Sequence, residues 1–219
     1  MKHDVLENSF MITYLLLYGT ALITLIEALR TPNVAVRHIL NLETSVSLIA
    51  GFVYGIFIER LKSGALKLDD VTKLRYIDWS ITTPLLLLVL LLFVSFESKS
   101  RVSFGFYSLI VLVNWIMLAV GYAAETESIT RRNGLIFGFG AYAVLLFLIW
   151  SQCLYGGYDI NSHTKLVFVA FAIIWGTYGI AFMLEPESKN IAYNTLDMIS
   201  KVFFGIFMWV YYGGIFGKK

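Results

Sequence analysis

Asp197 and Lys201 are charged residues inside a stretch near the C-terminus that is otherwise apolar enough to cross a bilayer. They stand at positions i and i+4, so both side chains lie on one helix face within reach of each other. A charge at membrane depth costs about 3 kcal/mol or more and is seldom accidental. A neutral lysine amine can form a Schiff base with an aldehyde. The pair therefore predicts a functional site, provided that other stretches supply partners.

A second charged group opens another apolar stretch. Arg75, Asp78 and Thr82 stand at i, i+3 and i+7, along one stripe of a helix. A carboxylate that faces a protonated amine favours the charged form of both groups, and Arg75 would hold Asp78 ionised. Thr82 could donate a hydrogen bond to Asp78 from the next turn. Alone, the pattern fits equally well a plain Arg75–Asp78 pair at a helix end.

Aromatic and amide side chains lie at similar depth in other stretches. Trp79, Trp175 and Tyr178 would suit the walls of a planar apolar ligand site, although such spacing is more often ordinary packing. Asn114 is polar in mid-stretch and needs a hydrogen-bond partner, for which Thr83 is a candidate.

Glu43 lies at or just inside the end of a further apolar stretch. An interfacial carboxylate that reaches water is at least as good an interpretation as a buried functional acid.

The composition is that of a membrane protein. Of 219 residues, 58% are hydrophobic and only 15% are charged, too few to cover a soluble domain of this size. A net charge of +2 without a Lys/Arg-rich run argues against nucleic-acid binding. Cys153 is alone, and His3, His38 and His163 have no metal-ligand spacing, so we expect neither a disulfide nor a metal site.

Seven apolar stretches of about 20 residues predict seven membrane-spanning helices. We expect an all-α, seven-transmembrane-helix bundle that forms a single domain over residues 1–219. Lysines and arginines divide about equally between the two sides, so the positive-inside rule does not fix the orientation. The expected spans are residues 9–29, 40–60, 75–96, 104–124, 134–154, 164–184 and 190–215.

These motifs together resemble the microbial (type 1) rhodopsins, in all seven spans and in their order. The short loops are similar to those of viral rhodopsins of giant algal viruses. The resemblance rests on Arg75-Tyr-Ile-Asp78-Trp79-x-x-Thr82-Thr83-Pro84 in the third span, Trp175-x-x-Tyr178 in the sixth and Asp197-x-x-x-Lys201 in the seventh.

The resemblance implies all-trans retinal, held as a protonated Schiff base on Lys201. Asp78 would be the primary counter-ion and proton acceptor, Asp197 the second counter-ion, and Arg75 would lie outward of both. Thr83 and Asn114 would tie the third and fourth spans together. The N-terminus would lie outside and the C-terminus in the cytoplasm. The residues that would line the chromophore are Trp79, Thr83, Leu86, Met117, Gly121, Trp175 and Tyr178.

Three positions depart from, or refine, the family pattern. Val89 stands where outward proton pumps carry the carboxylic acid that returns a proton to the Schiff base. We predict that Glu43 replaces that acid, because the inner end of the second span packs near the inner half of the third in this family. Gly179 replaces a proline of many relatives, and Leu86 predicts green absorption.

The favoured function is an outward light-driven proton pump rather than an enzyme. Asp78 argues against an anion pump, and the Asn-Asp-Gln triplet of sodium pumps is absent. A sensory photoreceptor and a light-gated channel stay open, since a missing donor slows the cycle. A transporter or receptor in which Asp197 and Lys201 form a plain ion pair is less favoured. The resemblance also implies a lipid bilayer as surroundings and a homo-oligomer, either a pentamer or a trimer.

Overall fold

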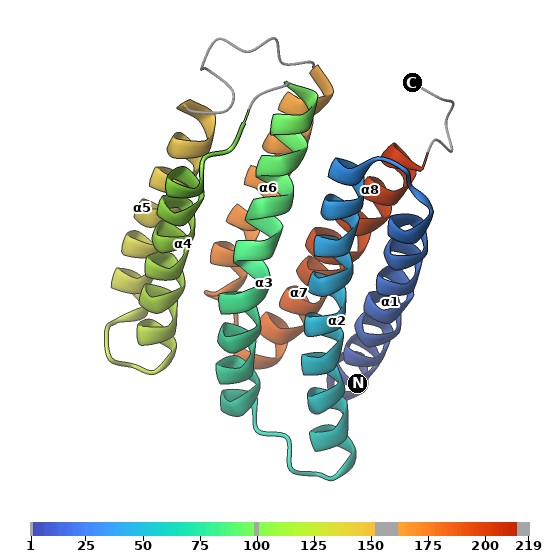
Figure 1. Ribbon diagram of the computed structural model, residues 1–219. Helices are drawn as coiled ribbons and strands as arrows, with labels where there is room; N and C mark the ends of the chain where they lie inside the picture. The colour runs from blue at the N-terminus through green and yellow to red at the C-terminus, as the bar shows by residue number, and fades with distance from the viewer. Residues whose placement is uncertain (1, 99–100, 152–161, 214–219) are drawn as a thin grey trace. The chain divides into compact units, whose positions relative to one another are not determined.

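The computed structural model describes residues 2–98, 101–151 and 162–213, and these residues fold as helices joined by short connections (Figure 1). Six of the helices are long and apolar enough to cross a membrane. The helices are α1 (Lys2–Arg30), α2 (Val34–Lys62), α3 (Leu68–Glu97), α4 (Phe104–Glu125), α5 (Arg131–Ile149), α6 (Ser162–Ala181), α7 (Pro186–Asp197) and α8 (Phe204–Tyr212), with a π-helix, η2 (Met198–Phe203), between the last two.

The seventh predicted span consists of α7, η2 and α8 in unbroken succession. A π-helix places an extra residue in the turn, and such turns are rare and concentrate at functional sites. Here the widened turn contains Lys201. The sequence predicts a helix over this stretch but contains no pattern that identifies the π-helical turn.

Most predicted bounds agree with the structure to within several residues. The helices extend beyond the expected spans at several ends, because polar turns continue past the apolar core of each span. By contrast, α6 ends at Ala181, three residues before the predicted end at residue 184. Residues 152–154 and 214–215 of the predicted spans lie outside the described residues.

The chain divides into two compact units, with the boundary inside α3 between Asp78 and Trp79. Unit 1 comprises residues 1–78 and 184–219, so it brings together distant parts of the sequence. In unit 1, α1 packs against α2 and against the seventh segment, which is the succession of α7, η2 and α8 (Figure 1).

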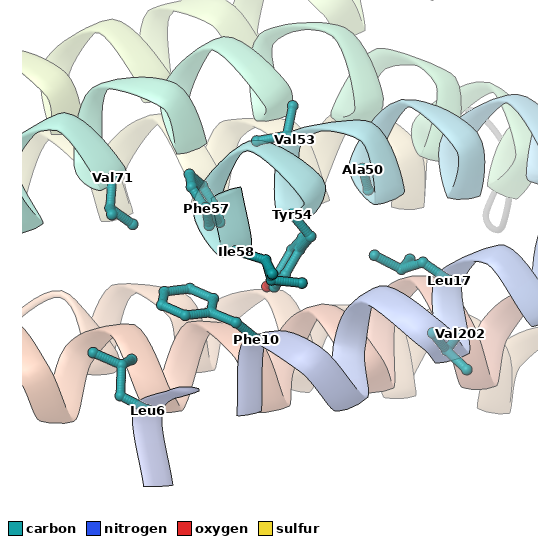
Figure 2. Close-up of a cluster of buried hydrophobic side chains, with 10 residues drawn as sticks. All are labelled: Leu6, Phe10, Leu17, Ala50, Val53, Tyr54, Phe57, Ile58, Val71 and Val202. Atoms are coloured by element: carbon teal, nitrogen blue, oxygen red, sulfur yellow. The ribbon is translucent and has the colours of Figure 1, made fainter. Parts of the chain in front are cut away.

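The core of unit 1 is apolar and rich in aromatic rings. Figure 2 shows Phe10 from α1 facing Tyr54 and Phe57 from α2. The Phe10 ring centroid lies 5.3 Å from that of Phe57 and 6.1 Å from that of Tyr54. These contacts hold the C-terminal half of α2 against α1 and fix the direction of the Tyr54 hydroxyl. The whole cluster contains Leu6, Phe10, Leu17, Ala50, Val53, Tyr54, Phe57, Ile58, Val71 and Val202.

Unit 2 comprises residues 79–183. Pro84 lies inside α3 and has no N–H group, so the Ser80 carbonyl one turn earlier loses its helical donor. The indole Nε1 of Trp115 in α4 donates to that carbonyl at 2.9 Å, and the Tyr107 hydroxyl donates to the Pro84 carbonyl at 3.2 Å. The helix therefore continues through the proline, and α4 is held against it.

Candidate functional site

Lys201 lies in η2 with only 1% of its surface exposed. Its Nζ lies 2.6 Å from Asp78 Oδ2, a charge-assisted hydrogen bond, and 3.6 Å from Asp197 Oδ1. Asp78 comes from α3 and Asp197 from the end of α7, so three elements of unit 1 meet at this amine. Two carboxylates beside one buried amine can hold a positive charge there, and can also accept its proton.

Arg75 lies one turn before Asp78 in α3 and is also buried. Its Nη1 lies 3.5 Å from Asp197 Oδ2 and donates to the Tyr54 hydroxyl at 3.1 Å. That hydroxyl in turn donates to Asp197 Oδ2 at 2.9 Å. One Asp197 oxygen therefore contacts Arg75 and the other lies near Lys201, so this carboxylate lies between the two cations.

Two asparagines of α7 hold the other side of the guanidinium. Arg75 Nε donates to Asn190 Oδ1 at 3.0 Å, and Arg75 Nη2 donates to Asn194 Oδ1. Asn194 also accepts from Tyr54 at 3.0 Å, while its Nδ2 donates to Ser9 Oγ in α1 at 2.7 Å. Neutral amides therefore fix Arg75 in place.

Sequence reasoning missed Tyr54, Asn190 and Asn194 as members of this network. The two asparagines could have been found, because Asn190, Asn194, Asp197 and Lys201 stand at i, i+4, i+7 and i+11. That spacing places a polar stripe along one helix face. Tyr54 carries no comparable pattern, since one tyrosine in an apolar span is ordinary.

Glu43 lies in α2 and is fully buried, with 0% exposure. It is not the interfacial carboxylate that the sequence left open, because α1 and α8 cover it. A Cβ atom placed on Gly205 would lie 3.3 Å from Glu43 Oε2 and 2.7 Å from the Thr20 methyl carbon. Gly205 follows Lys201 by one helical turn, so Glu43 lies against the same segment as the lysine.

The predicted ligand-lining residues lie in unit 2. The Trp79 and Tyr178 rings are 5.6 Å apart between centroids and nearly perpendicular at 89°, which joins α3 to α6. Trp175 packs on Phe171 with centroids 4.4 Å apart. These contacts give Trp79 and Tyr178 defined orientations before any ligand is considered.

The predicted partner of Asn114 is confirmed. Asn114 Nδ2 donates to Thr83 Oγ1 at 2.7 Å, and the Thr83 hydroxyl donates to the Trp79 carbonyl at 2.5 Å. Met117 and Gly121 follow Asn114 at i+3 and i+7 and are half-buried.

Three more predicted positions lie on α3 within unit 2. Thr82, Leu86 and Val89 are all buried. Thr82 follows Asp78 by one turn of the same helix, and its predicted hydrogen bond to Asp78 stays a prediction.

The fold and site together define a multi-pass integral membrane protein with a buried lysine between two carboxylates. The chain belongs to the bacteriorhodopsin-like protein family, whose sequence model matches residues 6–214. Membership of this family implies a retinal chromophore. The residues around Lys201 fit retinal bound there, because Asp78 and Asp197 can balance a positive charge at Lys201 Nζ.

Known proteins similar to this chain are microbial rhodopsins. The crystal structure of the viral rhodopsin OLPVRII superimposes with a TM-score of 0.90 at 38% identity, over 97% of this chain and 99% of that one. The opsin-like protein carO of Fusarium fujikuroi is 30% identical over 148 residues, which are 62% of this chain and 46% of that protein. A green-light absorbing proteorhodopsin from the gamma-proteobacterium EBAC31A08 is 23% identical, over 64% of this chain and 61% of its own length. The chain thus spans about half the length of this fungal protein, and the same share, 46%, of the opsin-like protein carO of Gibberella fujikuroi.

Proposed function

We propose that this protein is a light-driven outward proton pump that carries all-trans retinal on Lys201. Bound there as a protonated Schiff base, retinal would supply light absorption and the isomerisation that displaces the proton on Nζ. The observation that carries the proposal is the 2.6 Å contact between Lys201 Nζ and Asp78 Oδ2 in a site closed to water. An acceptor at hydrogen-bond distance is the first requirement for proton transfer.

Asp78 acts as the acceptor. The N–H bond at Lys201 Nζ breaks and an O–H bond forms on the Asp78 carboxylate, which neutralises both groups. Asp197 keeps its charge, because Arg75 and the Tyr54 hydroxyl contact its Oδ2. The two carboxylates therefore have different roles, one accepting the proton and the other balancing Arg75.

Glu43 acts as the donor in place of the acid that Val89 replaces. Among the described residues, neither Glu43 oxygen has a hydrogen-bond partner. An isolated buried carboxylate is so costly that the group folds as the neutral acid. It therefore enters the cycle with a proton to give, and its place against Gly205 sets it one turn from Lys201.

The direction of transport follows from the orientation that the family resemblance implies, with the N-terminus outside. Asp78 and Arg75 then lie toward the outer side of Lys201 and Glu43 toward the inner side. The proton leaves past Arg75, and Lys201 regains one from Glu43.

The test of the donor is Glu43→Gln. The substitution keeps the shape of the side chain and removes its proton, so the return of a proton to Lys201 Nζ slows and becomes dependent on the pH of the medium. The measurement is the recovery of visible absorption after a light flash. A recovery unchanged at every pH contradicts the donor role.

A sensory photoreceptor is the second candidate, and Val89 is the observation that favours it. Without an acid at that position the cycle slows, which suits signalling through a partner. The chain is also 26% identical over 145 residues to sensory rhodopsin-2 of Natronomonas pharaonis.

Photocurrent measured over a range of voltages in reconstituted membranes separates the functions. A pump gives outward current that keeps its sign at every voltage, whereas a channel current reverses. No current at any voltage points to the sensor.

A further inference from the structure

Several buried side chains of unit 1 have polar atoms without a hydrogen-bond partner in the described part of the chain, and three of these side chains belong to α1 and α2. They are Thr20 Oγ1 in α1, and both Glu43 oxygens and Ser47 Oγ in α2. Buried hydroxyls are normally paired, and each unpaired one costs free energy. Three such groups in one unit call for a functional explanation.

Two of these side chains, Thr20 and Glu43, share one location beside α8. The Thr20 methyl carbon and Glu43 Oε2 lie 2.7 Å and 3.3 Å from the same point, the Cβ position of Gly205. Ser47 follows Glu43 by four residues in α2, hence on the same helix face. Thr20 therefore lies beside the Glu43 carboxyl group at the place where it approaches α8, and Ser47 follows one turn along the same face of α2.

The next threonine of α1 provides a contrast. Thr24 Oγ1 lies 2.8 Å from Thr44 Oγ1 and donates to the Thr20 carbonyl at 2.9 Å. Its methyl carbon lies 3.9 Å from the same Gly205 position. Two threonines one turn apart on one helix thus differ in that one hydroxyl is paired and the other is not.

We propose that Thr20 and Ser47 are positioning residues for proton donation, and that their hydroxyls turn to donate to Glu43 once it is ionised. The inference rests on the proposed role of Glu43 as donor. When Glu43 gives its proton to Lys201 Nζ, an O–H bond breaks, an N–H bond forms, and a carboxylate is left in a buried site.

The free hydroxyls explain how that carboxylate is tolerated. Rotation of a threonine or serine side chain about its Cα–Cβ bond moves the hydroxyl oxygen itself. A hydroxyl that has no bond to the neutral acid can therefore swing round and donate to the anion. Hydrogen bonds to an ionised acceptor are about twice as strong as neutral ones. Both hydroxyls keep their own protons, and Glu43 later takes one from water at the inner side.

The test compares Thr20→Val with Thr24→Val in the full retinal-bound protein. Both changes replace a hydroxyl by a methyl group of nearly equal size. We expect Thr20→Val to slow proton return to Lys201 about tenfold, the loss of one hydrogen bond of about 1.4 kcal/mol. We expect Thr24→Val to change that rate less than about twofold, because the Thr24 hydroxyl already bonds to Thr44 and to the Thr20 carbonyl and is not proposed to donate to Glu43.

The second readout is the thermal unfolding midpoint of the retinal-free protein. Here we expect the larger effect from Thr24→Val and not from Thr20→Val. Thr24→Val removes the hydrogen bond between the Thr24 and Thr44 hydroxyls, so the midpoint falls by roughly 2–4 °C for each kcal/mol lost. Thr20→Val removes an unpaired hydroxyl and leaves the midpoint unchanged or higher. Residues with a merely structural role would change the midpoint and the rate together.

Ser47→Ala is the second variant, and it should also slow proton return without lowering the midpoint. If Glu43→Gln slows proton return while Thr20→Val and Ser47→Ala leave it unchanged, the positioning role is overturned and the donor role stands. If Glu43→Gln itself has no effect, the proposed donor fails, and the positioning role fails with it.

Discussion

At the scale of the residue, four charges share one buried place in unit 1. Arg75 and Lys201 supply two positive charges, and Asp78 and Asp197 supply two negative ones. Burying charges is tolerable only when they are paired and hydrogen-bonded, which is the case here. Each charge is therefore necessary to its neighbours, and neutralising one leaves another without its partner.

Lys201→Ala removes the only proposed attachment point of retinal. We expect protein purified with all-trans retinal to lose its visible absorption band. Lys189→Ala is the matched control, because Lys189 is also a buried lysine of the seventh segment. A visible band that survives in the Lys201 variant contradicts the assignment of the attachment site.

Asn194→Leu tests whether the Asn194 amide holds the Arg75 guanidinium in place. The change keeps the volume but removes the acceptor of Arg75 and Tyr54 and the donor to Ser9. We expect a stability loss of roughly 1–3 kcal/mol from the groups left unpaired. We also expect slower proton appearance outside, measured with a pH-indicating dye. Unchanged release kinetics would show that Arg75 does not need this residue.

At the scale of the element, the seventh segment combines a widened turn with close helix approach. The π-helix contains Lys201, and Gly205 one turn later lets α8 approach Thr20 and Glu43. Any side chain on Gly205 would meet the Thr20 methyl carbon at 2.7 Å, which is too close for real atoms. The glycine thus sets the spacing between the proposed donor and the segment that holds the lysine.

Gly205→Ala should therefore push Glu43 and Thr20 away from α8. We expect slower proton return to Lys201, with the wavelength of maximal absorption nearly unchanged, since the contacts of Asp78 and Asp197 stay in place. Gly19→Ala is a suitable control, because nothing lies within 4 Å of the Cβ position of Gly19. Equal kinetics in the two variants would argue against a spacing role.

At the scale of the whole molecule, the ion pairs join chain segments that are far apart in sequence. Asp78 and Lys201 are 123 residues apart, and their contact helps to close unit 1. Asp78→Asn leaves Lys201 and Arg75 with one carboxylate. We expect the retinal-free protein to lose about 3 kcal/mol, a fall in its unfolding midpoint of roughly 6–12 °C. An unchanged midpoint would mean that the pair contributes nothing to stability.

Much of this architecture is predictable from the sequence because bilayer thickness fixes span length, and buried charges are rare. Lys201, Asp197 and Asp78 are conspicuous in apolar surroundings for that reason. The burial of Glu43 is not predictable, since a residue near a span end can reach water or turn inward. In the structure α1 and α8 lie against Glu43 at Thr20 and Gly205, contacts between distant parts of the sequence that no local pattern predicts.

The separation of 123 residues between Asp78 and Lys201 also has a consequence for biosynthesis. Ribosomes add about 5–20 residues per second, so Arg75 and Asp78 enter the membrane roughly 10 s before the lysine does. During that interval they are three residues apart on one helix and can neutralise each other. We therefore expect the plain helix-end pair, one of two interpretations of the sequence, to describe the nascent chain. The arrival of the last span would then exchange those partners for the mature ones.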